Sequence, residues 1–424
     1  MAEPGGLMKT IVMGGGIIGV TTAWYLAEAG HDVTIVERRE NTGLETSFQN
    51  GALLAPGHSQ AWASPSAPMT LLKSFFQNDP WLRFRIRSEM SYWRWGLAFL
   101  QNCTSARYRA NTVRTLRIMM YGVAELRALR ERTGISYDEN DKGILYLFRT
   151  QESYDKGVAA WTLLREHGLP LETADRQRCT TIEPALKASM DKIGGGLFAP
   201  ADGAGDALLF TRNLAKLAEG KGVKIHLNTT VIGIECDGDR VTRIATDKGS
   251  VSGDSFVLAL GLQSPDLART AGIDLPIYPI KGYTVTIPTD GYPEAPTVGI
   301  IEEDNLVAFA RLGNRLRIGG KAEFADYDKS YAPAQFEGVF KVAQDLFPRG
   351  GDYAKPTYYA CLRPVTPGGP PILGPTRYRN LFVNAGHGAA GWTQACGACR
   401  AVVDMMLGRK PEIDMEGLTL ATMR

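Results

Sequence analysis

A short apolar run near the N-terminus leads into a glycine-rich turn and a helical stretch. Residues 9–13 (KTIVM) predict a buried strand, residues 14–19 (GGGIIG) a turn, and residues 20–29 a helix. Residues 31–36 (HDVTIV) predict a second strand, which ends at Glu37. Strand, glycine turn, helix and strand in this order indicate the start of a dinucleotide-binding domain.

The glycine spacing in this turn fits contact with a pyrophosphate. Gly14 permits the tight turn, Gly16 lets the backbone approach the phosphates, and Gly19 lets the helix pack on the strand. The helix N-terminus favours the negative charge. Glu37 is expected to accept hydrogen bonds from the adenosine ribose, which argues against a 2′-phosphate, although the adjacent Arg38 and Arg39 leave that question open.

The strand–helix alternation then stops for a long stretch. Residues 45–51 (ETSFQNG) are polar, and a Pro/Ser-rich passage follows them. The alternation resumes with a predicted helix over 206–220 and a strand over 223–228, after which a predicted hairpin leads on to residues 257–261 (VLALG). FAD and NAD share the glycine fingerprint, but a long functional loop and a domain split in sequence favour FAD.

The remaining segments predict a second region built mainly on an antiparallel sheet. Residues 107–132 place their apolar side chains on one helix face, so we expect a long amphipathic helix packed on a sheet. Further strands are predicted at residues 144–148, 283–287, 306–310 and 316–318.

A second strand, glycine turn and helix lie near the C-terminus. The strand is predicted at 381–384, the turn at 386–392 (GHGAAGW) and the helix at 393–407. Such a turn points a helix N-terminus at an electronegative group, such as a flavin ring that becomes anionic on reduction. The alternative is that the glycines only turn the chain and His387 is a turn residue.

Composition narrows the function classes. The chain has 424 residues, 44% of them hydrophobic, which predicts two or three globular domains. A formal net charge of +2 argues against nucleic acid as a partner. No apolar run reaches the 18 residues of a spanning helix. Residues 1–7 lack the features of a secretory signal and read as a disordered leader, with Met8 as an alternative start.

The six cysteines and one aromatic stretch give weaker signals. Scattered cysteines indicate a reducing, cytoplasmic setting. Cys396 and Cys399 have redox or half-zinc spacing, but no second CxxC completes a metal site, so packed small residues in a helix are favoured and no metal is predicted. Residues 81–87 (WLRFRIR) interleave aromatic residues with arginine and suit either a solvated face or an anionic membrane surface.

Seven motifs, spread over nearly the full chain, lie in the order of one known family. They are MGGGIIGVTTAWYLAEAGHDVTIVER, ETSFQNGALLAPG, GDALLFTRNLA, YPIKGYTVTIP, LFPRGG, CLRPVTPGGPPILG and NAGHGAAGWTQACG. On these motifs the chain resembles the FAD-dependent D-amino acid dehydrogenases of the small-subunit type, in the glycine/D-amino acid oxidase superfamily.

The resemblance implies an α/β fold with two domains. A Rossmann-like FAD-binding domain, discontinuous in sequence, takes residues 8–60, 205–275 and 361–424. An α+β substrate domain with a mainly antiparallel sheet takes residues 61–204 and 276–360.

The resemblance also implies the residues that contact FAD. They fall on the first turn and the strand after it (Gly14, Gly15, Gly16, Ile18, Gly19, Glu37, Arg38), on the loop beside the flavin (Thr46, Ser47, Asn50, Gly51), on Val231 and Gly261, and on the C-terminal turn with the arginine before it (Arg363, Gly386, His387, Gly388, Gly391, Trp392, Thr393).

The implied reaction moves a hydride from Cα of an amino acid to flavin N5. Arg363 falls on the arginine that pairs with the substrate carboxylate, and a planar guanidinium suits that task because it binds a carboxylate through two hydrogen bonds. Tyr283 and His58 are candidate pocket residues. The FAD is expected to be non-covalent, with a link through Cys361 as the alternative.

The resemblance defines the substrate and the partners less closely than the reaction. A cyclic substrate such as D-proline or 4-hydroxy-D-proline is the leading variant, and the resemblance implies a quinone or other electron acceptor, with peripheral contact at the inner face of the membrane. A glycine or sarcosine oxidase that uses oxygen is the alternative enzyme. The other alternative is an oligomer or a larger complex in which this chain is the FAD-holding subunit.

Overall fold

The computed structural model describes residues 8–77, 82–84 and 89–423. Among these residues, six strands form a first sheet in the order β19-β20-β13-β1-β2-β9. Every neighbouring pair is parallel except β19 with β20. The strands are β19 (Ile372–Pro375), β20 (Leu381–Ala385), β13 (Ser255–Leu258), β1 (Lys9–Met13), β2 (Asp32–Val36) and β9 (Lys224–His226).

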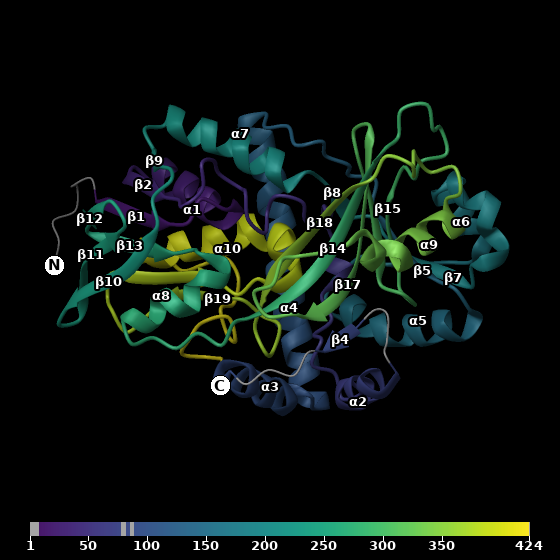
Figure 1. Ribbon diagram of the computed structural model, residues 1–424, viewed down its shortest axis with the longest axis horizontal. Coiled ribbons are helices and arrows are strands. Elements are labelled where there is room, and N and C mark those ends of the chain that lie inside the picture. The colour runs from purple at the N-terminus through teal and green to yellow at the C-terminus, as the bar shows by residue number, and fades with distance from the viewer. Residues whose placement is uncertain (1–7, 78–81, 85–88, 424) are drawn as a thin grey trace.

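Helices cover this sheet and enclose the first apolar core (Figure 1). Helix α1 (Ile17–Glu28) connects β1 to β2 and packs against α7 (Ala207–Gly220) and α10 (Gly391–Met406). A small sheet and a short helix lie at the far end: β10 (Val231–Asp237), β11 (Arg240–Thr246), β12 (Gly249–Ser252) and α8 (Ser264–Thr270).

A second sheet of nine described strands lies beside the first (Figure 1). Its order is β18-β14-β17-β16-β15-β5-β7-β6, with β4 paired to β17, and all its pairs are antiparallel except β15 with β5 and β17 with β4. The strands are β18 (Thr357–Val365), β14 (Tyr278–Pro288), β17 (Arg315–Phe324), β16 (Val307–Leu312), β15 (Gly299–Glu302), β5 (Ile144–Phe148), β7 (Gly195–Ala199), β6 (Glu172–Ala174) and β4 (Leu82–Phe84).

The remaining helices surround this second sheet. Helix α9 (Glu337–Leu346) buries an apolar face against it. The others are α2 (Ala67–Gln77), α3 (Met90–Asn102), α5 (Gln151–Glu166) and α6 (Arg176–Ile182). A two-stranded pair, β3 (Leu53–Leu54) with β8 (Gly203–Ala204), lies where the sheets meet. The mixed α/β class with a mainly antiparallel second sheet is confirmed.

The long predicted helix is present but has a different neighbour from the one expected. Helix α4 (Ser105–Thr133) ends at Gly134, which adopts the left-handed conformation. It packs mainly on helix α10 rather than directly on a sheet. A Cβ added at Gly122 would overlap the backbone of Thr393, and one at Gly397 would lie 2.7 Å from the Gly122 nitrogen. Glycines on both helices thus permit backbone contact.

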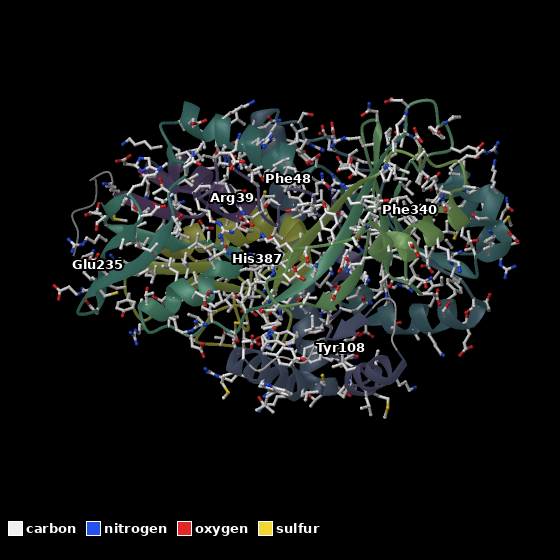
Figure 2. The ribbon with its side chains drawn as sticks, viewed as in Figure 1. Arg39, Phe48, Tyr108, Glu235, Phe340 and His387 are labelled. Atoms are coloured by element: carbon white, nitrogen blue, oxygen red, sulfur yellow. The ribbon has the colours of Figure 1, made fainter. Side chains whose placement is uncertain are left out.

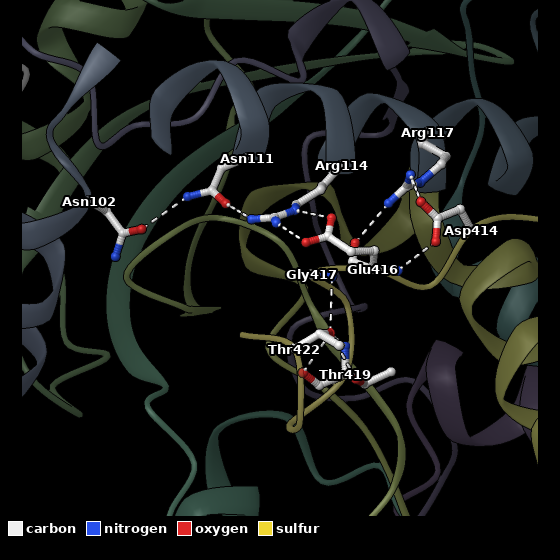
Figure 3. Close-up of polar contacts among 9 residues, drawn as sticks. All are labelled: Asn102, Asn111, Arg114, Arg117, Asp414, Glu416, Gly417, Thr419 and Thr422. Carbon is white, nitrogen blue, oxygen red and sulfur yellow. Dashed lines mark hydrogen bonds and ion pairs between the residues drawn. The ribbon is translucent and has the colours of Figure 1, made fainter. Parts of the chain in front are cut away.

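After α10 the C-terminal residues return along α4 and are held there by ion pairs (Figure 3). The Arg114 Nε lies 3.1 Å from Glu416 Oε2, and the Arg117 Nη1 lies 2.8 Å from Asp414 Oδ2. Arg114 also donates to Asn111 Oδ1. The C-terminal segment is therefore attached to the same helix that supports α10.

The aromatic and arginine stretch at residues 81–87 falls largely outside the described residues. Its described part, Leu82–Phe84, is strand β4 and pairs with β17. Beyond it, Trp93 is exposed, whereas Trp95 is buried and donates through its indole nitrogen to the Val365 carbonyl.

Candidate active site

A cavity of about 980 Å³ lies between the two sheets. This is the upper end of the volume range of small-molecule sites. The first glycine turn, the 45–51 loop, strands β17 and β18 and the C-terminal glycine turn all contribute to its wall. Figure 2 shows His387 near the centre of the molecule, between the two sheets. Segments far apart in sequence therefore converge on one space.

The three glycines of the first turn have different surroundings. Gly14 has φ +109°, and a Cβ there would lie 2.5 Å from the Ala259 oxygen. A Cβ on Gly19 would overlap the Gly14 carbonyl oxygen. A Cβ on Gly16 would meet only Ser47 Oγ, at 3.8 Å, and Gly16 lines the cavity. Two glycines are needed for packing, and the third leaves an open face toward a ligand.

Glu37 is held in position at the end of β2 by backbone amides. Its Oε2 accepts from the Gly15 nitrogen at 2.6 Å, and its Oε1 accepts from the Arg39 nitrogen at 2.8 Å. The side chain is buried yet lines the cavity. Because each carboxylate oxygen has a second acceptor position, Glu37 can still accept from ribose hydroxyls.

The two arginines after Glu37 pair with another carboxylate. Glu45 contacts Arg38, accepts from the Arg39 Nε at 2.6 Å, and accepts from the Lys329 Nζ at 2.5 Å. Burial acts to raise the pKa of Glu45, but Lys329 and the two arginines outweigh it and hold that pKa at about 2. The arginines are thus engaged by a fixed anion, which argues against a role in binding a 2′-phosphate.

Side chains of the 46–51 loop fix the backbone on which the loop lies. The Thr46 hydroxyl donates to the Leu362 carbonyl, and the Ser47 hydroxyl accepts from the Ile17 nitrogen at the start of α1. The Asn50 side chain accepts from the Ala52 nitrogen, which supports a left-handed Ala52 with φ +62°. These contacts tie the loop to helix α1 and to strand β18.

The C-terminal turn presents a neutral histidine and a helix N-terminus. Gly386 and Gly388 have positive φ, and α10 begins at Gly391. His387 is buried, burial lowers its pKa to about 3, and its Nε2 has no hydrogen-bond partner. The Thr393 hydroxyl accepts from the Ala55 nitrogen. An unsatisfied buried nitrogen beside the cavity is expected where a ligand supplies the partner.

Arg363 carries the charge on the opposite wall. It lies on β18 opposite Ile280, and its side chain crosses Gly282, where a Cβ would lie 2.6 Å from the guanidinium carbon. Within the described chain no acidic side chain pairs with it. Burial lowers its pKa, although an arginine remains protonated at any physiological pH. A cation on the cavity wall without a counter-ion suits an anionic ligand.

Tyr283, expected in the pocket, lies elsewhere. Strand residues alternate between faces, so Gly282 and Thr284 are directed at the cavity and Tyr283 at the core on the other face. The Tyr283 ring is fully buried, and its hydroxyl contacts Glu323 and accepts from the Gln335 amide at 3.1 Å. It belongs to the core of the second sheet, packed against Phe336.

Most of the other expected residues line the cavity, and a few lie behind its wall. His58 lines the cavity. Most of the expected FAD contacts do so too: Gly14, Gly16, Ile18, Glu37, Arg38, Thr46, Ser47, Asn50, Gly51, Gly261, His387, Gly388, Gly391, Trp392 and Thr393. Four do not line it: Gly15, Gly19, Val231 and Gly386. Of these, Gly15 and Gly19 act through the turn that they shape.

The cysteines differ in position. Cys361 lines the cavity, and burial raises the pKa of its thiol, which keeps it protonated. Cys396 and Cys399 are buried in α10 within the first core, and the Cys399 thiol donates to the Ile18 carbonyl. The described residues hold no group of three side chains that could bind a metal. The packed-helix interpretation of the CxxC spacing agrees with these contacts.

The residues around the cavity fit a dinucleotide cofactor. One end has an open glycine face at the N-terminus of α1 with Glu37 beside it, as a pyrophosphate and a ribose require. The middle has the N-terminus of α10 and the unsatisfied His387. The cofactor would be held by the first turn, the 46–51 loop and the C-terminal turn.

The sequence patterns did not predict some of the residues at the cavity. Lys329 and Tyr359 line it, and the Tyr359 ring meets the Phe48 ring edge to face, with centroids 5.3 Å apart. The Tyr359 hydroxyl donates to the Glu45 carbonyl. Their neighbours are more than 280 residues away in sequence, and no local motif marks them.

Comparisons with known proteins agree with this site. The family model described as FAD dependent oxidoreductase (DAO) matches residues 9–405. A protein named D-amino acid dehydrogenase 2, from Mesorhizobium japonicum, is 45% identical over 97% of this chain and 99% of its own length. One named D-amino acid dehydrogenase, from Paramagnetospirillum magneticum, is also 45% identical, over 97% of this chain and 98% of its own.

Solved structures share the fold at lower identity. Glycine oxidase from Geobacillus kaustophilus has a TM-score of 0.73 and 23% identity, with 97% of this chain and 98% of that chain covered. L-proline dehydrogenase from P. horikoshii has a TM-score of 0.74 and 20% identity, with 97% and 96% covered. The matches confirm the resemblance and the fold class that the motifs predicted.

Proposed function

Because this chain belongs to the DAO family of FAD-dependent oxidoreductases, we propose that it dehydrogenates free D-amino acids. The observation that carries the proposal is Arg363. Its guanidinium lines the same cavity as the two glycine turns and has no acidic partner among the described residues. It therefore offers two parallel hydrogen bonds to a substrate carboxylate.

The protein's part in the reaction is binding, orientation and charge. The chemistry that bound FAD would supply is that of a hydride acceptor for the hydrogen on Cα of the substrate. Arg363 fixes the carboxylate and with it the position of Cα. His387 stays neutral at physiological pH, so it adds no positive charge to compete with Arg363 for the carboxylate. Thr46, Ser47 and Thr393 hold the loops that border the reacting atoms.

The visible spectrum of the purified holoenzyme under anaerobic conditions tests this proposal. D-alanine, D-proline, cis-4-hydroxy-D-proline and their L-enantiomers are added one at a time. We expect the flavin band to bleach with D-substrates and not with L-substrates. A band that none of the D-compounds bleaches would contradict the proposal. Acid precipitation tests the cofactor link, since flavin bound to Cys361 would stay in the pellet.

The electron acceptor in this proposal is a membrane quinone rather than oxygen. Helices α2 and α3 lie together at one edge of the molecule (Figure 1). Ala67, Leu71 and Phe99 line the cavity from these helices. The same helices expose large apolar side chains: Met69, Leu72, Met90, Trp93, Leu97 and Leu100. Exposed apolar side chains of this kind suit contact with a bilayer surface. No described helix is long and apolar enough to span a bilayer.

Two measurements test the acceptor and the surface. Hydrogen peroxide formed rapidly in air would favour an oxygen-using oxidase instead. Lipid vesicles should sediment the wild-type protein more than a Trp93→Ser, Leu97→Ser double variant, because the variant loses exposed apolar area. If the two proteins sediment equally with the vesicles, α3 is not the surface that contacts the bilayer.

A further inference from the structure

A buried tyrosine and aspartate lie directly behind the turn that carries His58. Asp202 is fully buried, and its Oδ2 accepts from the Tyr146 hydroxyl at 2.5 Å and from the Gly57 nitrogen at 3.0 Å. Its Oδ1 is buried and has no hydrogen-bond partner. Tyr146 is fully buried on β5, against Trp161. One carboxylate oxygen is therefore fixed, and the other is left for a proton or a second donor.

A second carboxylate faces His58 itself. The His58 Nδ1 lies 3.8 Å from the Glu303 Oε1, and both atoms are buried without a hydrogen-bond partner. A shift of about 1 Å would bring them into hydrogen-bonding distance. Leaving two such atoms unsatisfied is costly, so the geometry favours a state in which a proton lies between them. His58 thus connects the cavity to a partly buried carboxylate.

The charges around Asp202 come from several elements. Burial raises the pKa of Asp202 to about 7, against the hydrogen bonds from Tyr146 and Gly57, the charge of Arg127, and the charge of His58 whenever that residue is protonated, all of which lower it. Arg127, on α4, donates to the Ala201 carbonyl and lies 3.8 Å from Asp141. A carboxyl group in this setting exchanges its proton near neutral pH.

We propose that His58 accepts the ammonium proton of the bound amino acid, and that Glu303 and the Asp202–Tyr146 pair take the proton onward. The inference rests on the proposed function and adds to it the fate of that proton. An N–H bond of the ammonium group breaks, its electron pair stays on nitrogen, and the proton bonds to the ring nitrogen that does not face Glu303. The neutral amine can then supply the electron pair that forms the C=N bond as the hydride leaves Cα.

The two carboxylates near His58 favour this proton transfer electrostatically. Proton uptake turns His58 into a cation in a wall that already holds Arg363. Glu303 and ionised Asp202 stabilise that cation, and Asp202 can itself take the proton so that no net charge remains on the imidazole. Tyr146 holds Asp202 in place as it changes between charged and neutral forms.

The anaerobic bleaching rate with a D-amino acid, measured from pH 6 to pH 10, tests the proposal on the holoenzyme. We expect His58→Gln to be about 100-fold slower at pH 7 and to approach wild type at pH 10, because substrate that arrives as a neutral amine needs no base. Asp202→Asn and Glu303→Gln should slow the reaction about 10-fold at pH 7, with the same recovery. His167→Gln should match wild type, because His167 is exposed at the C-terminal cap of α5.

Two outcomes would overturn the inference. One is a His58→Gln profile equal to wild type at every pH. The other is a loss of equal size at every pH, which would mean a structural role for His58. Wild-type profiles in both Asp202→Asn and Glu303→Gln would overturn the onward transfer and leave His58 acting alone.

A measurement without substrate separates this inference from the proposed function. The pKa of Asp202 is raised in the folded state, so the folded protein holds an extra proton between pH 4 and pH 7. The free energy of unfolding of wild type, minus that of Asp202→Asn, should therefore fall as the pH rises through that window and stay level above it. A flat difference would overturn proton storage at Asp202, whether or not D-amino acids bleach the flavin. If Asp202→Asn does not fold, Tyr146→Phe tests the same site.

Discussion

The two walls of the cavity satisfy their polar groups in different ways. On the cofactor wall, the Glu37 carboxylate accepts from two backbone amides, and three cations surround Glu45. On the substrate wall, Arg363 has no acidic partner in the described chain, and the His58 Nδ1 lacks a hydrogen bond. The charged groups of the first wall are thus paired within the protein, although the His387 Nε2 there still lacks a hydrogen bond, whereas the second wall leaves a charge as well as hydrogen-bonding capacity for a ligand.

This difference shows where the protein keeps stability and where it gives stability up for function. A cofactor that stays bound can be held by rigid loops whose charged groups are already paired with one another. A substrate must bind and leave in each turnover, so its partner must be held ready and unsatisfied in between. An unpaired buried cation destabilises the fold, and a ligand carboxylate relieves that cost.

Arg363→Met should show the largest effect and the sharpest contrast. We expect kcat/KM for the D-substrate to fall about 1,000-fold, or about 4 kcal/mol, because the carboxylate loses its charged partner. Arg363→Lys should recover little, since a point charge does not replace the planar pair of donors. The unfolding free energy of the apoprotein should stay constant or rise, because a partly buried charge without a counter-ion is removed.

Arg149→Met is the matched control for that stability prediction. Arg149 is also mostly buried, but it pairs with Glu302 at 3.1 Å and with Asp345 at 2.9 Å. Its loss should reduce the unfolding free energy by about 2–3 kcal/mol, because Glu302 is left buried and unpaired. If denaturant titrations show Arg363→Met to be as destabilised as Arg149→Met, Arg363 serves the fold and the contrast between the walls fails.

Two glycine variants test the cofactor wall. Gly19→Ala should lower the unfolding free energy of the apoprotein by about 3 kcal/mol, because the methyl group meets the Gly14 backbone, which cannot move aside. Gly16→Ala should fold with nearly wild-type stability, because its methyl group points into open space, yet should bind much less FAD. The ratio of flavin absorbance to protein gives the second result, and a Gly16→Ala protein with full FAD content would place the pyrophosphate elsewhere.

His387 predicts a pH dependence of stability with a definite sign. Burial lowers its folded pKa to about 3, below the value near 6.5 of the unfolded chain. The unfolded state therefore binds one more proton between these values, and stability rises with pH through the window. Relative to His387→Gln, wild-type apoprotein should gain about 3 kcal/mol from pH 4 to 6.5. Parallel pH profiles of the two proteins would mean that His387 titrates normally.

The parts of the molecule that the sequence predicted are those set by neighbours along the chain. The β1 strand, the Gly14 to Gly19 turn and helix α4 follow from local spacing, and the structure has them within a few residues. Arg363 came from a motif. No motif predicted which way the Tyr283 side chain points. Side chains alternate between the two faces of β14, so a shift of one residue along the strand would move Tyr283 to the other face.

Contacts between distant segments were also beyond the sequence. Helix α4 was expected on a sheet, but Gly122 and Gly397, 275 residues apart, bring it onto α10. The pairing of Tyr146 with Asp202 depends on how β5 lies beside the turn after β7. No periodicity encodes such pairs, since either partner alone reads as an ordinary core or loop residue.

The ion pairs that hold the C-terminal segment to α4 give the smallest effect and a baseline for the cavity charges (Figure 3). Glu416 and Asp414 are more than half exposed, so solvent screens their pairs with Arg114 and Arg117. Arg114→Ala and Arg117→Ala should each lower the unfolding free energy by less than about 1 kcal/mol, with unchanged flavin bleaching. This loss of unfolding free energy should be smaller still in 1 M salt, because salt screens exposed charges. If either variant loses as much unfolding free energy as Arg149→Met, exposed and buried ion pairs contribute equally to stability in this protein. The missing partner of Arg363 would then give no reason to expect a bound anion there.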